Sequence, residues 1–502
     1  MRILLASIAT LSFAACASVP ANVAMAQSAD MLIRNVTVID PDGRTSTPVQ
    51  DVYILDGRIV EIADSGSSGR VAEQVTEGEG RYLIPGLMDM HAHTSFRPVH
   101  QPSLTLMLAN GVTGVREMGS DCVDPEGIAM CIGEMRDAHA QIVAGEIVGP
   151  RMLELSSSKI DSNRPDDANA VQAAYRPISA EDAEVTIAFM QERGADFLKT
   201  GDEFRPEAFA TFARVATEQD MRFGGHVPPY LSVADVANMG MTSIEHARDL
   251  PLDCSTYGSE FRAGVLAALS GERESFPNRM EMAARSRDTF DETICAGQIE
   301  AMRANGTYYV PTHLTREMDY RAGDEDYRND PRFDYIMAMQ QRFWFQDMDR
   351  TAERLGPIRS DLEDFFNLGL RTTGLAHAAG VQIMAGTDAN DTMVFPGFSL
   401  HDELRHLVAA GLSPMDALRA ATSVPAAYLG RESDFGGVSE GRMADLILLR
   451  ADPLADIGNT REIEAVFFGG RLHDRAALDA MLAEVRAWVA DADASMAAQA
   501  DD

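Results

Sequence analysis

Two histidines close the apolar stretch IPGLMDMHAH at residues 84–93. His91 and His93 are two positions apart, so in an extended strand both side chains point to the same face. Imidazole is a common ligand for transition metals, and two rings on one face could share an ion. The same pair would also suit a polar strand end that enters a loop. Partners elsewhere in the chain must decide between the two interpretations.

Four more side chains suited to a metal site each follow a short apolar stretch. Lys199 is the penultimate residue of ADFLKT, His226 follows FGG, His246 follows SIE and Asp388 ends AGTD. Taken singly, the histidines could be loop or core residues and the aspartate a helix N-cap. Lys199 is the hardest to explain as structural, because an uncompensated ammonium in a buried strand costs free energy. The set therefore indicates a metal centre.

Imidazole and carboxylate donors favour two divalent cations, Zn²⁺ first, with Mn²⁺, Fe²⁺ or Co²⁺ as alternatives. The histidine pair and Asp388 would hold one ion, and His226 and His246 the second. Lys199 cannot bind metal as an ammonium, but a carbamate formed with CO₂ would bridge both ions. A bridging hydroxide would then attack a carbonyl, with Asp388 as general base and acid toward the leaving nitrogen.

Eight apolar stretches that alternate with helical patterns must position these residues. Alternating strand–helix units predict a parallel sheet, and eight of them predict an α/β fold of the (β/α)₈ TIM-barrel type, with its site at the C-terminal strand ends. The eight stretches are YLIPGLMDMH (82–91), GVTGVREM (111–118), RMLELS (151–156), ADFLKT (195–200), MRFGGHV (221–227), MTSIEHA (241–247), GTYYVPTHL (306–314) and VQIMAGTD (381–388).

Both ends of the chain read as β-structure. DVYILDGRIVEI (51–62) predicts a hairpin that turns at Asp56-Gly57, and IEAVFFGGRL (463–472) predicts one that turns at Gly469-Gly470. We expect one small β-sandwich built from both ends beside the barrel. The predicted order is a signal peptide (1–26), an N-terminal sandwich segment (27–85), a barrel (86–430) with a helical insertion at about 316–376, a C-terminal sandwich segment (431–475), and a final helix with an acidic tail (476–502).

The N-terminus predicts export. Arg2, an apolar run and the small residues AMA at 24–26 are typical of a cleaved signal peptide, which places the protein in the periplasm or outside the cell. A lipid anchor through Cys16, in FAAC, is the alternative. Four cysteines remain, and their local spacing favours disulfides Cys122–Cys131 and Cys254–Cys295, with four buried thiols as the alternative.

The composition of the chain limits the classes of molecule that we expect it to bind. The formal charge of −34 opposes binding to nucleic acid or to anionic membrane surfaces, and no later segment reads as a transmembrane span. The 45% of hydrophobic residues is enough for a large core. A small molecule or short peptide is the expected substrate, and homo-oligomerisation stays open.

The blocks IPGLMDMHAH, LANGVTGVREMG, DFLKT, GGHV, SIEHA, AGTDA and GGVSEGRMADLILL resemble the amidohydrolase superfamily, in its imidazolonepropionase-like and Xaa-Pro-dipeptidase-like branch. The resemblance covers about residues 31–475. It implies a barrel with a β-sandwich, a binuclear centre with a carboxylated Lys199, and hydrolysis of an amide-type bond.

One departure from that branch concerns the substrate. Relatives that act on dipeptides often place a tyrosine two residues after the strand-5 histidine, where this chain has Pro228. Tyr230 could donate to a tetrahedral oxyanion or pack against Pro229. His313 could contact substrate or be a loop histidine remote from the metals. Arg316 and Arg371 could bind a substrate carboxylate, but the sequence does not place them.

The sequence therefore predicts an exported binuclear hydrolase of a peptide-like or N-acyl amide bond, with dipeptidase- or carboxypeptidase-like activity as one form. A lactonase or esterase on the same site is the alternative. A mononuclear deaminase is disfavoured because deaminases of the superfamily generally lack the strand-4 lysine. A non-catalytic binding protein is disfavoured because every ligand is retained.

Overall fold

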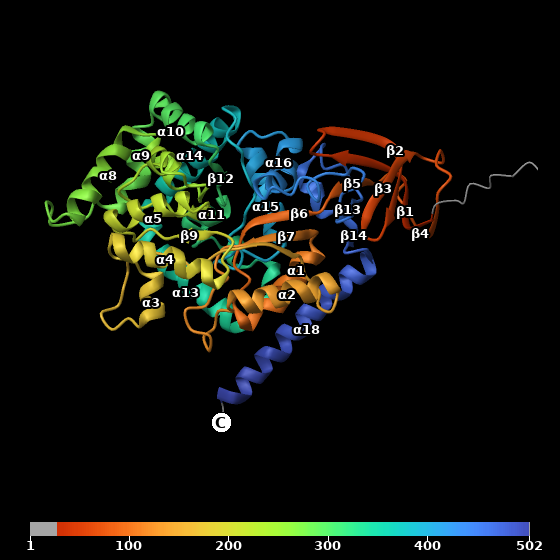
Figure 1. The fold of residues 1–502 in the computed structure, drawn as a ribbon, viewed down its shortest axis with the longest axis horizontal. Coiled ribbons are helices and arrows are strands. Elements are labelled where there is room, and N and C mark those ends of the chain that lie inside the picture. The colour runs from red at the N-terminus through yellow and green to blue at the C-terminus, as the bar shows by residue number, and fades with distance from the viewer. Residues whose placement is uncertain (1–27, 501–502) are drawn as a thin grey trace, which may run out of the picture.

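The computed structural model describes residues 28–500. A barrel of parallel strands with surrounding helices lies beside a small sheet domain (Figure 1). This arrangement confirms the predicted fold class, a (β/α)₈ barrel with a small β-domain built from both chain ends. The expected signal peptide (1–26) and the alternative anchor at Cys16 lie outside the described residues.

Strands from the two chain ends pair in one sheet of eight strands. The N-terminal strand β5 pairs antiparallel with the C-terminal strand β13, which joins the two ends. Ile59 of β3 and Phe467 of β14 share one apolar core, so the sheet folds over itself as a small sandwich. Its strands are β1 (Ser28–Asp40), β2 (Thr45–Leu55), β3 (Arg58–Asp64), β4 (Val71–Glu77), β5 (Tyr82–Pro85), β13 (Leu446–Leu449), β14 (Ile463–Phe468) and β15 (Arg471–Asp474).

The two predicted hairpins are present, and their turns touch. Asp56-Gly57 joins β2 to β3, and Gly469-Gly470 joins β14 to β15. All four residues have positive φ, between 50° and 75°, as two-residue hairpin turns require. A Cβ on Gly57 would lie 3.3 Å from the backbone nitrogen of Gly470. Glycine is therefore needed here both for the turn and for the close approach of the two ends.

The barrel closes through parallel pairs in two hydrogen-bonded groups that three isolated contacts join. One group is β6-β7-β8 and the other is β9-β10-β11-β12. Ser156 pairs with Phe197, Tyr309 with Ile383, and Ala92 with Ala389, so residues 381–389 act as the eighth strand. The assigned strands are β6 (Leu87–Ala92), β7 (Val112–Glu117), β8 (Arg151–Leu155), β9 (Leu198–Thr200), β10 (Phe223–Gly225), β11 (Ser243–Glu245) and β12 (Tyr308–Val310).

The first apolar stretch, 82–91, is two strands rather than the single strand that the sequence predicts. The chain leaves the sheet domain after Pro85 and enters the barrel at Leu87. Gly86 makes this crossing, and its backbone N–H donates to the carbonyl of Asp445 at 2.8 Å. A Cβ at Gly86 would lie 2.1 Å from Oγ1 of Thr113. The expected domain boundary between residues 85 and 86 falls at this crossing, but the apolar run is alike in both sheets and gives no sign that the strand is interrupted.

Helices cover the outside of the barrel, and the segment predicted as a helical insertion contains α11 to α14 (Figure 1). Helix α18 begins at Arg475, and Val485 and Val489 pack against Leu106 of α1. The helices are α1 (His100–Ala109), α2 (Ile132–Ala144), α3 (Ala170–Tyr175), α4 (Ala180–Arg193), α5 (Pro206–Glu218), α6 (Val233–Asn238), α7 (Asp249–Asp253), α8 (Thr256–Leu269), α9 (Met282–Asp288), α10 (Glu292–Asn305), α11 (His313–Arg321), α12 (Glu325–Arg328), α13 (Ala338–Leu355), α14 (Arg359–Ala378), α15 (Phe398–Ala409), α16 (Pro414–Ala420), α17 (Ser423–Tyr428) and α18 (Arg475–Ala500).

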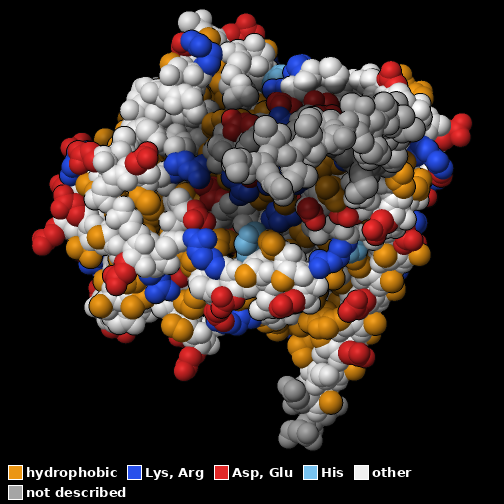
Figure 2. All heavy atoms as spheres, turned by 45° about the vertical axis from the view of Figure 1, so that its right-hand side comes forward, with side chains coloured by type: hydrophobic (Ala, Val, Ile, Leu, Met, Phe, Trp, Pro, Cys, Tyr) orange, Lys and Arg blue, Asp and Glu red, His pale blue; other side chains and the backbone are white. Residues whose placement is uncertain are grey.

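The negative charge is distributed over the surface. Acidic side chains are scattered across the face seen in Figure 2, whereas apolar side chains gather along α18 where it meets the rest of the molecule. Within residues 28–500, no helix is long and apolar enough to cross a bilayer. On the face seen in Figure 2, the acidic side chains do not form one continuous patch.

Gly86→Ala should destabilise the protein by about 1–3 kcal/mol, because the new methyl group overlaps Thr113 at the crossing between the two domains. Urea unfolding of the full chain measures this. Gly297→Ala is the matched control, since nothing lies within 4 Å of that position in α10 and alanine favours a helix. Equal unfolding midpoints for the two variants would contradict the tight crossing.

Candidate metal centre

Three of the six predicted ligands converge at one point. His91 is the penultimate residue of β6, His93 follows that strand, and Asp388 lies one residue before the end of the eighth strand. Their ligand atoms lie within 4.8 Å of one another. Oδ1 of Asp388 is 3.3 Å from Nε2 of His91 and 3.0 Å from Nε2 of His93. Burial lowers the pKa of His93 to about 4, and the Lys199 charge adds to the shift, which favours the neutral imidazole that binds metal.

Lys199 points into the same cluster from β9. Its Nζ lies 3.2 Å from Nε2 of His91 and 3.3 Å from Nε2 of His93. The residue is only 4% exposed, and this burial lowers the pKa of its amine. The neutral amine is the form that reacts with CO₂, so the position suits a carbamate that would bridge two ions. Lys159 and Lys199 are the chain's two lysines, beside 41 arginines among the 43 basic residues.

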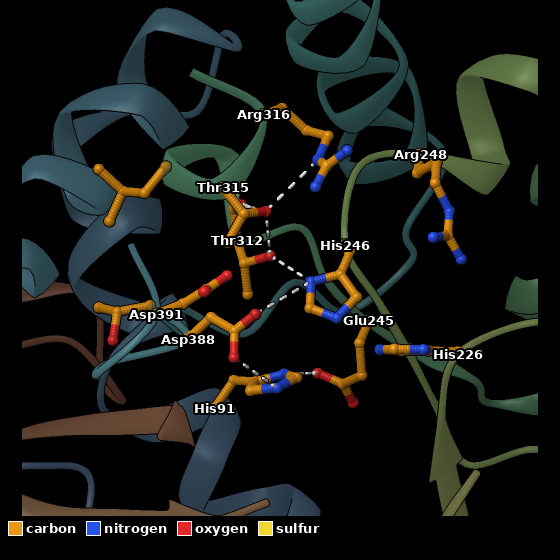
Figure 3. Close-up of polar contacts among 12 residues, drawn as sticks. His91, His226, Glu245, His246, Arg248, Thr312, Thr315, Arg316, Asp388 and Asp391 are labelled. Carbon is orange, nitrogen blue, oxygen red and sulfur yellow. Dashed lines mark hydrogen bonds and ion pairs between the residues drawn. The ribbon is translucent and has the colours of Figure 1, made fainter. Parts of the chain in front are cut away.

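The two remaining histidines complete the group. The rings of His226 and His246 have centroids 5.0 Å apart, and the ring of His246 is also 5.0 Å from that of His91. Nδ1 of His246 hydrogen-bonds to Oγ1 of Thr312 at 2.7 Å and lies 3.7 Å from Oδ2 of Asp388 (Figure 3). The structure thus brings all six predicted side chains to one end of the barrel.

The backbone at this end is strained. His246 and Asp388 both have φ of 69°, and Thr312 has φ of 40°, in the left-handed region that non-glycine residues rarely adopt. Each such residue costs of order 1–3 kcal/mol and persists where its surroundings fix it. The amide of Asp388 donates to the carbonyl of His91 at 2.7 Å, and that of His246 to the carbonyl of Val310 at 2.8 Å. These bonds hold both side chains over the barrel opening.

A buried ion pair orients His91. Nδ1 of His91 donates to Oε2 of Glu245 at 2.8 Å, so Nε2 faces the cluster. Glu245 in turn accepts from Nη2 of Arg116 at 2.7 Å, and both side chains are fully buried. Arg116 also donates to the carbonyl of Met90 at 2.6 Å and lies over the ring of Phe197. The pair balances two charges that the barrel interior could not hold singly.

Sequence reasoning missed several of these supporting residues. Glu245 and Arg116 lie in SIEHA and GVREM, and Asp89 lies in MDMH. Asp89 is also fully buried and accepts from the amide and hydroxyl of Thr387, and its burial raises its pKa to about 6. The cost of a charge in a buried strand, which singled out Lys199, would have singled out these three as well.

The predicted substrate residues have varied positions. The ring of Tyr230 packs with Phe261 and Val265, and its hydroxyl is buried without a hydrogen-bond partner in the described part of the chain. His313 has no exposed surface, and its Nε2 lies 3.2 Å from Oγ1 of Thr373 in α14. Arg371 pairs with Glu292 on the outer surface.

Two arginines flank the cluster. Figure 3 shows Arg248 and Arg316 on one side of the His–Asp group. Arg248 follows β11 and lies 3.9 Å from Oδ2 of Asp202, whose Oδ1 is 3.4 Å from Nδ1 of His226. Arg316 contacts Oγ1 of Thr315 at 3.4 Å. Both arginine side chains are about one quarter exposed, at 24% and 25%, and each also pairs with a carboxylate on its own segment, Arg248 with Asp249 at 3.3 Å and Arg316 with Asp319 at 2.6 Å.

Two disulfides fix loops around the barrel. Cys122 is bonded to Cys131, between β7 and α2, and Cys254 to Cys295, between the end of α7 and α10. Each closes a local loop rather than linking distant parts of the chain. Each therefore restricts the unfolded chain locally.

The fold is a (β/α)₈ barrel with candidate metal-binding side chains at its C-terminal face, and comparison with known proteins assigns the family. The amidohydrolase family profile matches residues 82–473. The chain belongs to the amidohydrolase family. The family generally uses metal ions, and the convergent imidazole and carboxylate donors described above fit such a group.

Similar proteins differ in their described activities. A bottromycin amidohydrolase shares 21% identity and a TM-score of 0.66, over 91% of this chain and 90% of that chain. A Xaa-Pro dipeptidase with bound methionine shares 19% sequence identity and a TM-score of 0.61, over 88% of this chain and 99% of that chain. These identities show the fold. Adenine deaminase 3 of Rhizobium meliloti (strain 1021) is 37% identical over 88% of this chain and 58% of the relative, and the chain spans less than two thirds of each curated relative it matches.

Arg116→Met should lower the free energy of unfolding by about 3–5 kcal/mol, because Glu245 would be left as an uncompensated buried charge. Urea unfolding of the metal-loaded protein measures it. Arg214→Met is the control, since Arg214 pairs with Glu184 and Glu218 at the surface and should leave the transition unchanged. Similar transitions for both variants would show that the buried pair contributes no more than a surface pair.

Proposed function

We propose that this protein is an exported, binuclear, metal-dependent amidohydrolase that cleaves a peptide-like or N-acyl amide bond. The proposal rests chiefly on Lys199, whose amine lies within 3.3 Å of the Nε2 atoms of both His91 and His93. An ammonium at that place would repel a cation, whereas a carbamate would bind two. Disulfides persist in oxidising compartments, so the two disulfides support export to the periplasm or the medium.

The residues present would hold two divalent ions, most suitably Zn²⁺. His91, His93 and Asp388 would bind one, His226 and His246 the other, and a Lys199 carbamate both. When bound, such ions supply a Lewis acid for the carbonyl and lower the pKa of water. These donors match the preference of such ions for nitrogen and oxygen ligands.

The side chains then have distinct tasks. Asp388, whose Oδ2 lies 3.7 Å from His246 Nδ1, takes a proton from the attacking water and passes it to the leaving nitrogen. Glu245 keeps His91 in the tautomer that presents Nε2. Arg248 and Arg316, which flank the cluster, would bind a carboxylate on the substrate in exchange for contacts with Asp249 and Asp319, which suits a dipeptide or an N-acyl amino acid.

Deamination is the second candidate, favoured by the 37% identity to adenine deaminase 3. Both reactions begin with attack of water at a carbon bonded to nitrogen, so the same residues could serve. Incubating the metal-loaded protein with adenine, and separately with N-acyl amino acids and dipeptides, distinguishes them through the products. Ammonia and hypoxanthine from adenine, with no amide cleavage, would replace the first proposal by the second.

Lys199→Ala should remove most of the bound metal, about two ions per chain in the wild type, and abolish hydrolysis. Elemental analysis and ¹³C NMR after [¹³C]bicarbonate labelling provide readouts besides activity. A carbamate signal should be present in the wild type, and a short carboxylate such as propionate should partly restore activity to the variant. Lys159→Ala, at an exposed lysine, should keep both metal and signal. A metal-free wild type with full activity would refute the binuclear site.

Asp388→Asn should slow amide hydrolysis about 10²–10⁴-fold, and ester hydrolysis about tenfold less, because a leaving amine needs a proton more than a leaving alkoxide does. The measurement is kcat/KM for an amide and an ester of the same acid. Both rates come from one metal-quantified sample, so incomplete loading cancels in their ratio. An equal loss on both substrates would assign Asp388 to metal binding alone, and a preference of the wild type for esters would favour the lactonase or esterase alternative.

A further inference from the structure

A cleft of about 540 Å³ opens on the C-terminal face of the barrel, beside the candidate metal centre. Its wall includes residues from the loops that follow β8, β9 and β10 and from helix α8. In barrels of this kind those loops form the substrate site. The volume lies within the range of about 300–1,000 Å³ that small-molecule sites occupy.

The cleft meets the metal centre at Asp202. This carboxylate lines the cleft, and its Oδ1 lies 3.4 Å from Nδ1 of the predicted ligand His226. Tyr230, only four residues after His226, forms another section of the wall. A group held in the cleft is therefore separated from a metal ligand by a single side chain. This placement makes the cleft an extension of the same site.

One face of helix α8 makes the cleft apolar. Phe261, Val265 and Leu269 are spaced i, i+4 and i+8, so they form one stripe along the helix. Phe261 and Val265 pack with the ring of Tyr230, which fixes the inner wall. Leu269 and the following Phe276 complete the outer wall.

The outer wall leaves apolar surface open to solvent. Leu269 is 43% exposed and Phe276 is 60% exposed. Large apolar side chains exposed together at the mouth of a cleft mark a place where a ligand is bound. The buried hydroxyl of Tyr230, which lacks a hydrogen-bond partner among residues 28–500, leaves one donor in the wall.

The charged side chains of this cleft do not determine which ligands it prefers. Its acidic residues Asp202 and Glu203 are balanced by Arg205 and Arg279. Asp202 is also engaged by His226 and Arg248, as described above. A cleft with balanced charges and an apolar helix face favours ligands with apolar surface, because burial of that surface contributes the binding free energy.

We propose that this cleft holds a bulky apolar group of the amide substrate, either an aromatic or long aliphatic side chain or an acyl chain of that kind. The inference rests on the proposed function and specifies its substrate class. The enzyme then prefers amides with a large apolar group on one side of the scissile bond over amides with small groups. Phe261, Val265, Leu269, Phe276 and Tyr230 are the contacts.

The test compares kcat/KM along two substrate series, N-acylglycines of increasing acyl length and N-acetyl amino acids of increasing side-chain size. In the wild type we expect a rise of at least about tenfold from the smallest to the bulkiest member of one series. Leu269→Arg should abolish that rise by placing a charge in the outer wall. Leu266→Arg, on the same helix with 45% exposure but outside the cleft, should keep it.

Phe276→Ala and Phe343→Ala form a second matched pair, with 60% and 61% exposure, of which only Phe276 lines the cleft. Only Phe276→Ala should reduce the preference, at unchanged metal content. A wild type that turns over small and bulky amides equally, or cleft variants that keep the full preference, would overturn the inference.

Binding separates failure of this inference from failure of the proposed function. Isothermal titration of the metal-loaded protein with N-decanoylglycine and with N-acetylglycine requires no turnover. Tighter binding of the decanoyl compound that is lost in Leu269→Arg, without amide hydrolysis, would support the cleft and refute the amidohydrolase activity. Amide hydrolysis with equal binding of both compounds would support the amidohydrolase activity and refute the apolar cleft.

Discussion

The fully buried ion pair between Arg116 and Glu245 is the interaction on which the site depends. Glu245 can stay ionised inside the barrel because Arg116 neutralises it, and the nearby guanidinium helps hold its pKa at about 2 against the effect of burial. The ionised carboxylate then fixes the tautomer of His91 and turns Nε2 toward Lys199 and Asp388. The Arg116–Glu245 ion pair and its hydrogen bond to His91 thus fix the orientation of one candidate metal ligand.

The two ends of the barrel have different roles. At the end that meets the sheet domain, Arg151 pairs with Asp445 at 2.7 Å, and Gly86 donates to the carbonyl of Asp445. These contacts join the domains tightly. At the opposite end, His246 and Asp388 occupy left-handed backbone positions whose cost the surrounding hydrogen bonds offset. Stability is concentrated where the domains join, and strain where chemistry is expected.

In the function that we propose, the residues that select the substrate are separate from the candidate metal ligands. The six metal-ligand candidates come from strand ends, whereas the apolar cleft draws its walls from the loops after β8, β9 and β10 and from α8. One fold can carry many activities because such loops vary independently of the strands. The similar proteins reflect this, since they include an amidohydrolase, a dipeptidase and a deaminase.

Local chemistry let the sequence predict the fold class and the six candidate ligands that the structure brings together. The alternation of strands and helices predicts the barrel, the Asp-Gly and Gly-Gly pairs predict both hairpins, and His91, His93 and Lys199 stand out because charged or polar groups at apolar strand ends need a reason. These features depend on residues that are near one another in the chain. They can therefore be interpreted without knowing which residues lie opposite them in the folded barrel.

Tertiary structure alone decided the rest. Glu245 is 129 residues from Arg116 and 154 from His91, so no local pattern could reveal that the three form one network. At the point where residues 82–91 divide into two strands, Gly86 meets Thr113 and Asp445, which are distant in the chain. The burial of His313 against α14 and the joining of Tyr230 to the α8 stripe likewise depend on elements that only folding brings together. Such contacts are set by packing in three dimensions, which composition and spacing do not encode.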